Sequence, residues 1–238
     1  MKYRAMILAA GLGVRMRPLT DHTPKPLLTV GDKPMVSWQI ESLVRAGFTD
    51  ITINTSHYAD LWLPIVEDAR CVGANITLLN EGETPYESLG GICNMLRHLP
   101  AEQQSTRTPF LVASGDVFTD FDYGSLVPVL QKIEAGGVDA HFVLADNPPF
   151  HLAGDFAIRD GLATRTGQRL NFSGITCWHP NVFRDVPIGT RERLFPWADA
   201  LVADNRVSAE HYPRLWENIG TPAQLASLRQ RLGAKISM

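Results

Sequence analysis

Short apolar runs recur through the first 145 residues of the chain, and the segments between them are long enough for helices. The runs lie at 5–10, 51–54, 76–79, 110–113 and 140–145. They show little polar alternation, which is typical of strands buried on both faces of a parallel sheet. Helices are predicted between them, over 34–46, 58–71, 90–99 and 125–135. This order predicts an α/β fold with a doubly wound, mostly parallel central sheet.

After about residue 146 the pattern changes to loops and shorter elements. Prolines and glycines interrupt the chain at 148–149, 154, 161 and 167, and these residue types are typical of turns. A strand is predicted over 172–178, and helices over 194–203 and 221–232, with Thr221 as the cap of the last helix. We interpret 1–238 as a single domain in which 146–238 form a smaller lobe on the sheet of 1–145.

Composition excludes several classes of partner. Of the 238 residues, 45% are hydrophobic and 20% are charged, and the formal net charge is −3. A nucleic-acid partner is not expected, because it would need a basic surface. The cysteines, Cys71, Cys93 and Cys177, form no CxxC pair, which is typical of reduced thiols. The first apolar run is too short for a signal peptide, and no run reaches the roughly 18 residues of a membrane helix. We therefore expect a soluble, cytoplasmic protein that does not associate with a membrane.

The first apolar run leads into a loop that carries two glycines and two cations. Residues 8–30 read LAAGLGVRMRPLTDHTPKPLLTV. The backbone amides around Gly11 and Gly13 can face phosphate oxygens. Arg15 offers a planar fork of donors, and Lys25, which lies between two prolines, offers a point charge. This pattern predicts a phosphate site directly after the first strand.

Two common phosphate-binding motifs do not fit this loop. A dinucleotide fingerprint needs a glycine at position 16 and an acidic residue at the end of the second strand, where the chain has Met16 and Asn54-Thr55. A P-loop would close with Gly-Lys-Ser/Thr, which is absent. Ligands of doubly wound sheets bind beyond the carboxyl ends of the strands. The turn Ser114-Gly115-Asp116 ends another apolar run and is therefore expected beside the glycine loop.

The sequence also resembles a known family. LAAGLGVRMRPLT followed by TPKPLLTV is similar to the signature of the sugar-1-phosphate nucleotidylyltransferases. Weaker matches, including 115–117, 154–156, 172–175 and 216–221, resemble in particular the short bacterial N-acetylmuramate 1-phosphate uridylyltransferases of cell-wall recycling. The resemblance implies a Rossmann-like, GT-A-like sheet, with a nucleotide-binding half over 1–145 and a sugar-binding half over 146–238.

The reaction that the resemblance implies is transfer of a nucleotidyl group, UMP from UTP, to a sugar 1-phosphate, here N-acetylmuramic acid 1-phosphate, with release of pyrophosphate. The second pKa of a phosphomonoester is near 6, so the attacking group is already largely a dianion and needs no general base. The chemistry needs alignment of two polyanions and neutralisation of their charge. We assign Arg15 to the leaving pyrophosphate, Lys25 to the α-phosphate or the incoming phosphate, and Asp116 to the expected cofactor, Mg²⁺.

The resemblance implies binding residues for each partner, a nucleoside triphosphate and a sugar 1-phosphate. For the nucleotide these are Ala10, Gly11, Gly13, Arg15, Lys25, Glu87, Gly90 and Ser114. For the sugar they are Asp146, Gly154, Asp155, Asn171 and Ser173. The metal ligands are Asp116 and Asn218. A monomer or a small homo-oligomer is expected.

The chain departs from the family pattern at Asn218 and Leu89, and more mildly at Ser114, where relatives often have asparagine. Asn218 stands where the family has a metal-binding aspartate, so we expect weaker Mg²⁺ binding without nucleotide. Glu217 is not expected to replace it, because adjacent strand residues point to opposite faces. Leu89 stands where the family has glycine, and its side chain is expected to crowd a nucleobase.

Three alternatives stay open. The same chemistry could serve glucose 1-phosphate or mannose 1-phosphate with another nucleotide. A catalytically weakened homologue that binds a nucleotide sugar is favoured only by Asn218. A metal-dependent glycosyltransferase would use the DxD of Asp120 and Asp122, which we interpret instead as turn and helix-start residues.

Overall fold

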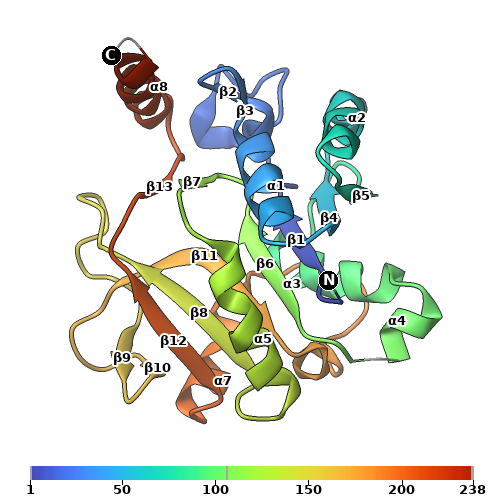
Figure 1. Ribbon diagram of the computed structural model, residues 1–238, viewed down its shortest axis with the longest axis vertical. Coiled ribbons are helices and arrows are strands. Elements are labelled where there is room, and N and C mark those ends of the chain that lie inside the picture. The colour runs from blue at the N-terminus through green and yellow to red at the C-terminus, as the bar shows by residue number, and fades with distance from the viewer. Residues whose placement is uncertain (1, 106, 237–238) are drawn as a thin grey trace.

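The computed structural model describes residues 2–105 and 107–236. Within them, nine strands form one sheet in the order β5-β4-β1-β6-β11-β8-β12-β10-β9 (Figure 1). The first half supplies β1 (Ala5–Leu8), β4 (Asp50–Thr55), β5 (Asn75–Asn80), β6 (Phe110–Ser114) and β8 (Ala140–Ala145). The second half supplies β9 (Ala157–Arg159), β10 (Leu162–Thr164), β11 (Asn171–Trp178) and β12 (Val207–Tyr212). Each apolar run of the first half therefore forms a strand.

The strands of the first half run in one direction. β1 pairs in parallel with β4 and β6, and β4 pairs in parallel with β5. β11 runs antiparallel between β6 and β8, β12 is parallel to β8, and β10 is antiparallel to both of its neighbours. The expected α/β fold with a mostly parallel sheet is confirmed. Because β1, β4 and β6 are parallel neighbours, their carboxyl ends meet at one edge of the sheet.

Helices cover both faces of the sheet because strand side chains alternate between two apolar clusters. The covering helices are α1 (Met35–Arg45), α2 (Leu63–Cys71) and α5 (Val127–Glu134) on one face, and α3 (Glu87–His98) and α7 (Asp199–Ala203) on the other. Ala5 and Ile7 of β1 face the first group, and Met6 faces the second. Figure 1 shows α1 and α5 in front of the sheet and α3 behind it.

A third apolar cluster lies beneath the C-terminal helix α8 (Pro222–Ile236). Leu225 and Leu228 pack there with Met16 and Met35. Two short antiparallel strand pairs adjoin this cluster. One is the hairpin of β2 (Thr29–Val30) with β3 (Lys33–Pro34), and the other joins two distant segments, β7 (Val117–Thr119) and β13 (Trp216–Asn218). Figure 1 shows α8 beside the β2–β3 hairpin. Met16 thereby anchors the turn that carries Arg15.

The remaining short elements were not predicted from the sequence as separate elements. They are α4 (Ala101–Ser105) and the 3-10 turns η1 (Val14–Met16), η2 (Lys25–Leu27), η3 (Ala59–Trp62), η4 (Tyr123–Leu126) and η5 (Pro180–Phe183). The helix expected over 194–203 is instead two helices, α6 (Leu194–Trp197) and α7. Phe195 is extended because it precedes a proline, which disfavours helical dihedrals. Among the described residues, no helix has the length and hydropathy to cross a membrane.

Candidate functional site

A pocket of about 510 Å³ lies at the carboxyl edge of the sheet, where β1, β4 and β6 end. Its lining comes from residues 8–14, Lys25, Pro26, Asn54, Thr84, Pro85, Glu87, Ser88, Ser114 and Asp116. The parallel pairing of β1 with β6 brings Leu8 opposite Ser114. The glycine loop and the turn after β6 are therefore neighbours, as expected from the sequence.

The two glycines of the first loop have different roles. Gly13 has a φ of +63°, and a Cβ there would stand 2.9 Å from Cγ2 of Thr20, so this position favours glycine. The Thr20 hydroxyl donates to the Gly13 carbonyl at 2.8 Å, which folds the loop back on itself. A Cβ on Gly11 would meet no atom within 4 Å. The backbone at Gly11, next to Ala10 in the lining, is therefore open to a ligand.

Lys25 and Asp116 form the charged pair of the pocket. The Nζ of Lys25 lies 2.5 Å from Oδ2 of Asp116, and the two side chains are only 15% and 21% exposed. Prolines on both sides of the lysine hold it in the turn η2. The Gly115 amide donates to the Leu8 carbonyl at 2.8 Å, and a Cβ on Gly115 would stand 2.9 Å from that oxygen. Glycine at 115 thus lets Asp116 approach the end of β1.

Arg15 lies at the rim of the pocket, outside its lining. Its side chain is exposed, and a Cβ built on Gly220 would stand 3.5 Å from its Nη2. Its neighbour Met16 is fully buried beneath α8. The guanidinium therefore stands between the glycine loop and the connection from β13 to α8.

The pairing of β7 with β13 brings Asn218 next to Asp116. Asn218 stands opposite the residue that follows Asp116, and the Ile219 amide donates to the Asp116 carbonyl at 2.9 Å. Glu217 faces away and pairs with Arg231 of α8, as strand alternation requires. One carboxylate and one amide oxygen suit Mg²⁺, which keeps several waters and is usually shared with substrate phosphates. No group of three or more His, Cys, Asp or Glu side chains in the described residues forms a protein-only metal site.

The DxD pair is part of the scaffold. Asp120 accepts a hydrogen bond from the Tyr212 hydroxyl and pairs with Arg214 at 2.9 Å. Asp122 accepts from the Gly124 amide at 2.9 Å and caps η4. These contacts match the expected turn and helix-start roles and remove the support for a glycosyltransferase metal site.

A buried network ties the ends of β1, β4 and β5 to the start of α3. Asn54 accepts from the Ala9 amide at 2.8 Å and donates to Oε1 of Glu81 at 2.9 Å. The second oxygen of Glu81 accepts from the Tyr86 amide at 2.8 Å. Burial raises the pKa of the Glu81 carboxyl, although both hydrogen bonds act to lower it. In the sequence Asn54 marks only the end of an apolar run, and nothing there indicates its contact with Glu81.

Leu89 does not crowd the pocket, which corrects the expectation from the sequence. It is 1% exposed and packs with Met6 and Ile92 in the core between α3 and the sheet. Helix α3 begins two residues earlier, so its first turn directs position 89 inward. A side chain at this position therefore leaves room for a nucleobase.

Glu87 and Gly90 lie at the start of the same helix. Glu87 has a φ of +60° and lines the pocket. Gly90 lies outside the lining, and a Cβ there would stand 2.1 Å from the carbonyl oxygen of Thr190. Glycine at 90 thus allows residues 190–192 to pack against α3. The assignment of these residues to the nucleotide stays a prediction.

The residues assigned to the sugar lie outside the lining of the 510 Å³ pocket. Asp146 is exposed and contacts His211, with 2.8 Å between Oδ1 and Nε2. Gly154 has a φ of +60°, and a Cβ there would stand 2.6 Å from the Arg169 carbonyl oxygen. Both residues lie near the loop between β8 and β9.

Asp155, Asn171 and Ser173 hold backbone groups around the start of β11. Asp155 accepts from the Phe172 amide at 2.8 Å, and Asn171 donates to the Phe172 carbonyl at 2.8 Å. Ser173 is 1% exposed and donates to the Val143 carbonyl at 2.6 Å. These bonds give the three residues a structural role, and direct contact with a sugar stays a prediction.

Comparisons with known proteins agree with this geometry. The sequence model of the family described as nucleotidyl transferase matches residues 4–151. The N-acetylmuramate alpha-1-phosphate uridylyltransferase of Neisseria meningitidis serogroup B is 36% identical, over 97% of this chain and 99% of that protein. The mannose-1-phosphate guanyltransferase of Hypocrea jecorina is 28% identical, over 94% of this chain and 62% of that protein. The crystal structure of HddC from Yersinia pseudotuberculosis complexed with GMP-PN has a TM-score of 0.75 and 20% identity, and the match covers 97% of this chain and 99% of that one.

Proposed function

Because this chain belongs to the nucleotidyl transferase family, we propose that it transfers UMP from UTP to N-acetylmuramic acid 1-phosphate, forming the UDP-sugar and pyrophosphate. Its relatives are named as transferases of sugar 1-phosphates, and the chain is a nucleotidyltransferase of this kind. The choice of substrates is supported by the full-length match to the uridylyltransferase of Neisseria meningitidis. In this proposal the reaction takes place in the cytoplasm and returns a cell-wall sugar to the nucleotide-sugar pool.

The observation that carries the proposal is the Lys25–Asp116 pair beside the open backbone at Gly11. A phosphate oxygen of the sugar 1-phosphate attacks the α-phosphorus, and the bond between that phosphorus and the oxygen bridging to the β-phosphate breaks. The attacking group is largely a dianion at neutral pH, so no side chain has to remove a proton. Lys25 neutralises charge between the two reacting phosphates, which would otherwise repel each other.

The remaining groups position the triphosphate. Arg15, at the rim, presents a planar fork of donors that suits the leaving pyrophosphate. The open backbone at Gly11 lets phosphate oxygens approach the loop. Asp116 and Asn218 would hold Mg²⁺, which when bound neutralises charge on the phosphate oxygens. The roles of these residues are thus alignment and charge neutralisation, as expected for phosphoryl-group chemistry.

A second candidate keeps this chemistry and changes the substrates to GTP and mannose 1-phosphate. It is favoured by the relative from Hypocrea jecorina, of which the chain spans 62%. Because Leu89 is buried, it does not discriminate between nucleobases. The catalytically weakened homologue is less well supported, since Arg15, Lys25 and Asp116 are all present.

Pyrophosphate release, measured with Mg²⁺ over a panel of substrates, tests the proposal. The panel pairs UTP, GTP and dTTP with N-acetylmuramic acid 1-phosphate, mannose 1-phosphate and glucose 1-phosphate. We expect kcat/KM for UTP with N-acetylmuramic acid 1-phosphate to exceed that of every other pair by about tenfold or more. A maximum at GTP with mannose 1-phosphate would assign the second function. No release with any pair would support the weakened homologue.

A further inference from the structure

A second cavity, of about 700 Å³, lies at the opposite edge of the sheet. Arg4, just before β1, and Phe110, the first residue of β6, are part of its lining. The 510 Å³ pocket at the carboxyl edge, called the nucleotide pocket below, is lined by residues at and after the ends of the same two strands. At about 3.3 Å per residue, these strands separate the two cavities by roughly 15 Å. The cavities share no lining residue.

Positive charge is concentrated in this cavity. The chain has 22 lysines and arginines and 25 acidic residues. Among the described residues, five basic residues line the cavity, and Asp50 is the one acidic residue that does so. The basic residues are Lys2, Arg4, Arg97, Arg107 and Arg184. Because the whole chain has a formal charge of −3, this concentration is a local feature.

Of the basic residues Lys2, Arg97 and Arg184, only Lys2 has a carboxylate partner among the described residues. Lys2 pairs with Glu134 at 2.6 Å. Arg97 and Arg184 have neutral acceptors, the Val186 carbonyl at 2.6 Å and the Asn181 amide oxygen at 3.3 Å. Burial lowers the pKa of the Arg4 guanidinium, while Asp50 acts to raise it. An anion in the cavity would be attracted by these guanidinium groups.

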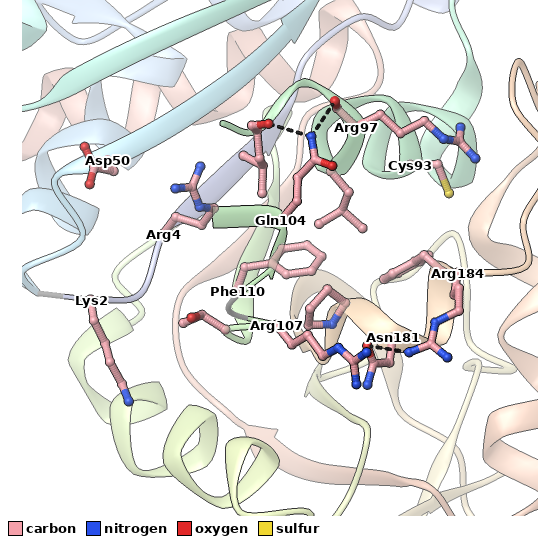
Figure 2. A pocket seen from close by; sticks show the side chains of 15 residues that line it. Lys2, Arg4, Asp50, Cys93, Arg97, Gln104, Arg107, Phe110, Asn181 and Arg184 are labelled. Carbon is pink, nitrogen blue, oxygen red and sulfur yellow. Dashed lines mark hydrogen bonds between the residues drawn. The ribbon is translucent and has the colours of Figure 1, made fainter. Parts of the chain in front are cut away.

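The shape and chemistry of the lining suggest what kind of anion fits. Figure 2 shows Arg107, Asn181 and Arg184 close together at one end of the cavity, with Phe110 between them and Arg4. Guanidinium groups bind phosphate through paired hydrogen bonds. Leu96 and Leu99 are half-buried and supply apolar surface to the lining, whereas Phe110 and Phe183 are almost fully covered by the protein. The volume is within the usual range of small-molecule sites, about 300–1,000 Å³.

We propose that this cavity binds a phosphorylated small molecule, with the phosphate held by Arg107 and Arg184 and a ring packed against Leu96 and Leu99. The bound molecule acts as an effector of the nucleotide pocket. This second part rests on the proposed function, whereas the binding itself does not.

Two segments connect the cavity with the nucleotide pocket. Helix α3 begins at the pocket with Glu87 and ends at the cavity, where Arg97 contributes to the lining. Residues 184–192 run alongside it in the opposite sense: the Val186 carbonyl accepts from Arg97, and the Glu192 carbonyl accepts from the Leu89 amide at 2.9 Å. A ligand that contacts Arg184 and Arg97 therefore contacts both segments that frame the start of α3.

Calorimetric titration with phenyl phosphate tests the binding, because this probe combines a phosphate dianion with an aromatic ring. We expect one site in the wild-type protein, the same affinity in Lys25→Ala and in the control Arg45→Gln, and a loss of about tenfold or more in Arg184→Gln. Arg45 is a matched control, since it is an arginine with one neutral partner, Ser42, outside the cavity. Inorganic phosphate should bind more weakly than phenyl phosphate.

Several outcomes would overturn the binding proposal. They are no binding to the wild type, loss of binding in Lys25→Ala with Arg184→Gln unaffected, and equal affinity for inorganic phosphate. Arg107→Gln provides a second variant should Arg184→Gln unfold, as judged by thermal denaturation.

The effector role predicts that phenyl phosphate changes the KM for UTP about twofold or more in the wild type and not in Arg184→Gln. Binding with an unchanged KM would refute the effector role alone, and absence of transferase activity would refute the proposed function and leave the binding result intact.

Discussion

The Nζ of Lys25 lies 2.5 Å from Oδ2 of Asp116, although 91 positions separate the two residues. Each charge partly satisfies the other in a pocket that exposes little of either side chain. Phosphate and metal would replace this contact, the lysine turning to a phosphate oxygen and the carboxylate to the cation. The pair therefore keeps two opposite charges ready in the partly buried site until the substrates bind.

Removal of Lys25 should abolish most of the activity. Lys25→Ala removes the positive charge between the two reacting phosphates, so we expect turnover to fall by about a hundredfold or more. Arg15→Ala should have a similar effect through the leaving pyrophosphate. Pyrophosphate release at saturating substrate measures both, with circular dichroism to confirm the fold.

Lys33→Ala is the matched control for Lys25→Ala. Lys33 also pairs with a carboxylate, that of Glu41 at 2.6 Å, and is similarly shielded, but it lies outside the pocket. Turnover should remain near that of the wild type. If Lys25→Ala and Lys33→Ala lost activity equally, the assignment of Lys25 would be wrong.

Replacement of Asn218 by aspartate should make the protein bind Mg²⁺ more tightly. A carboxylate adds a charged ligand where the amide offers only a neutral oxygen. We expect the half-saturating Mg²⁺ concentration of Asn218→Asp to fall by about tenfold, measured by titration of activity. Glu217→Gln should leave the titration unchanged, because Glu217 faces Arg231. An unchanged response in Asn218→Asp would remove residue 218 from the metal site.

The sequence predicted those parts of the molecule that depend on local patterns. Unbroken apolar runs can be buried only between two layers of helices, so the strands of the first half were recognised. Parallel neighbours then bring the loops after β1 and β6 together, so the proximity of the glycine loop to Asp116 followed. The alternation of side chains along a strand likewise predicted that Glu217 and Asn218 point to opposite faces.

Other features depend on contacts between distant segments and were not recognisable in the sequence. The side chain of Leu89 points inward because α3 begins at Glu87, and no pattern within residues 84–91 fixes that start. Asn54 and Glu81 meet because β4 and β5 are neighbours in the sheet. The segments of β9, β10 and β12 form strands because they pair with neighbouring strands. Their own sequences do not contain the unbroken apolar runs that marked the strands of the first half.

Truncation of Leu89 should reduce stability without changing nucleotide preference. Because the side chain is 1% exposed, Leu89→Ala should lower the free energy of unfolding by about 2–5 kcal/mol. Leu63→Ala, at an exposed position of α2, should change it by less than about 0.5 kcal/mol. Urea denaturation measures both. A shift in the ratio of kcat/KM for UTP and GTP in Leu89→Ala would restore the original expectation that this side chain faces the nucleobase.

The buried carboxyl of Glu81 should produce a characteristic dependence of stability on pH. Burial raises its pKa above the usual 4.5, so the folded protein binds this proton more tightly than the unfolded chain does. Its contribution to the free energy of unfolding is therefore greatest below pH 4.5 and declines as the pH rises through the raised pKa. Relative to Glu81→Gln, which lacks this titration, the wild type should lose stability between pH 4.5 and neutral pH.

Glu134→Gln is the matched control, because it should give the opposite slope. Hydrogen bonds from Lys2 and Tyr3 lower the pKa of the Glu134 carboxyl, so its stabilising contribution is present above the unfolded pKa and is lost as the pH falls through the folded one. Relative to Glu134→Gln, the wild type should therefore gain stability as the pH rises. Urea denaturation at a series of pH values measures both differences. The stability of the wild type relative to Glu81→Gln could instead grow as the pH rises. That result would show that the hydrogen bonds of the Glu81 carboxylate with Tyr86 and Asn54 outweigh the cost of burying its charge.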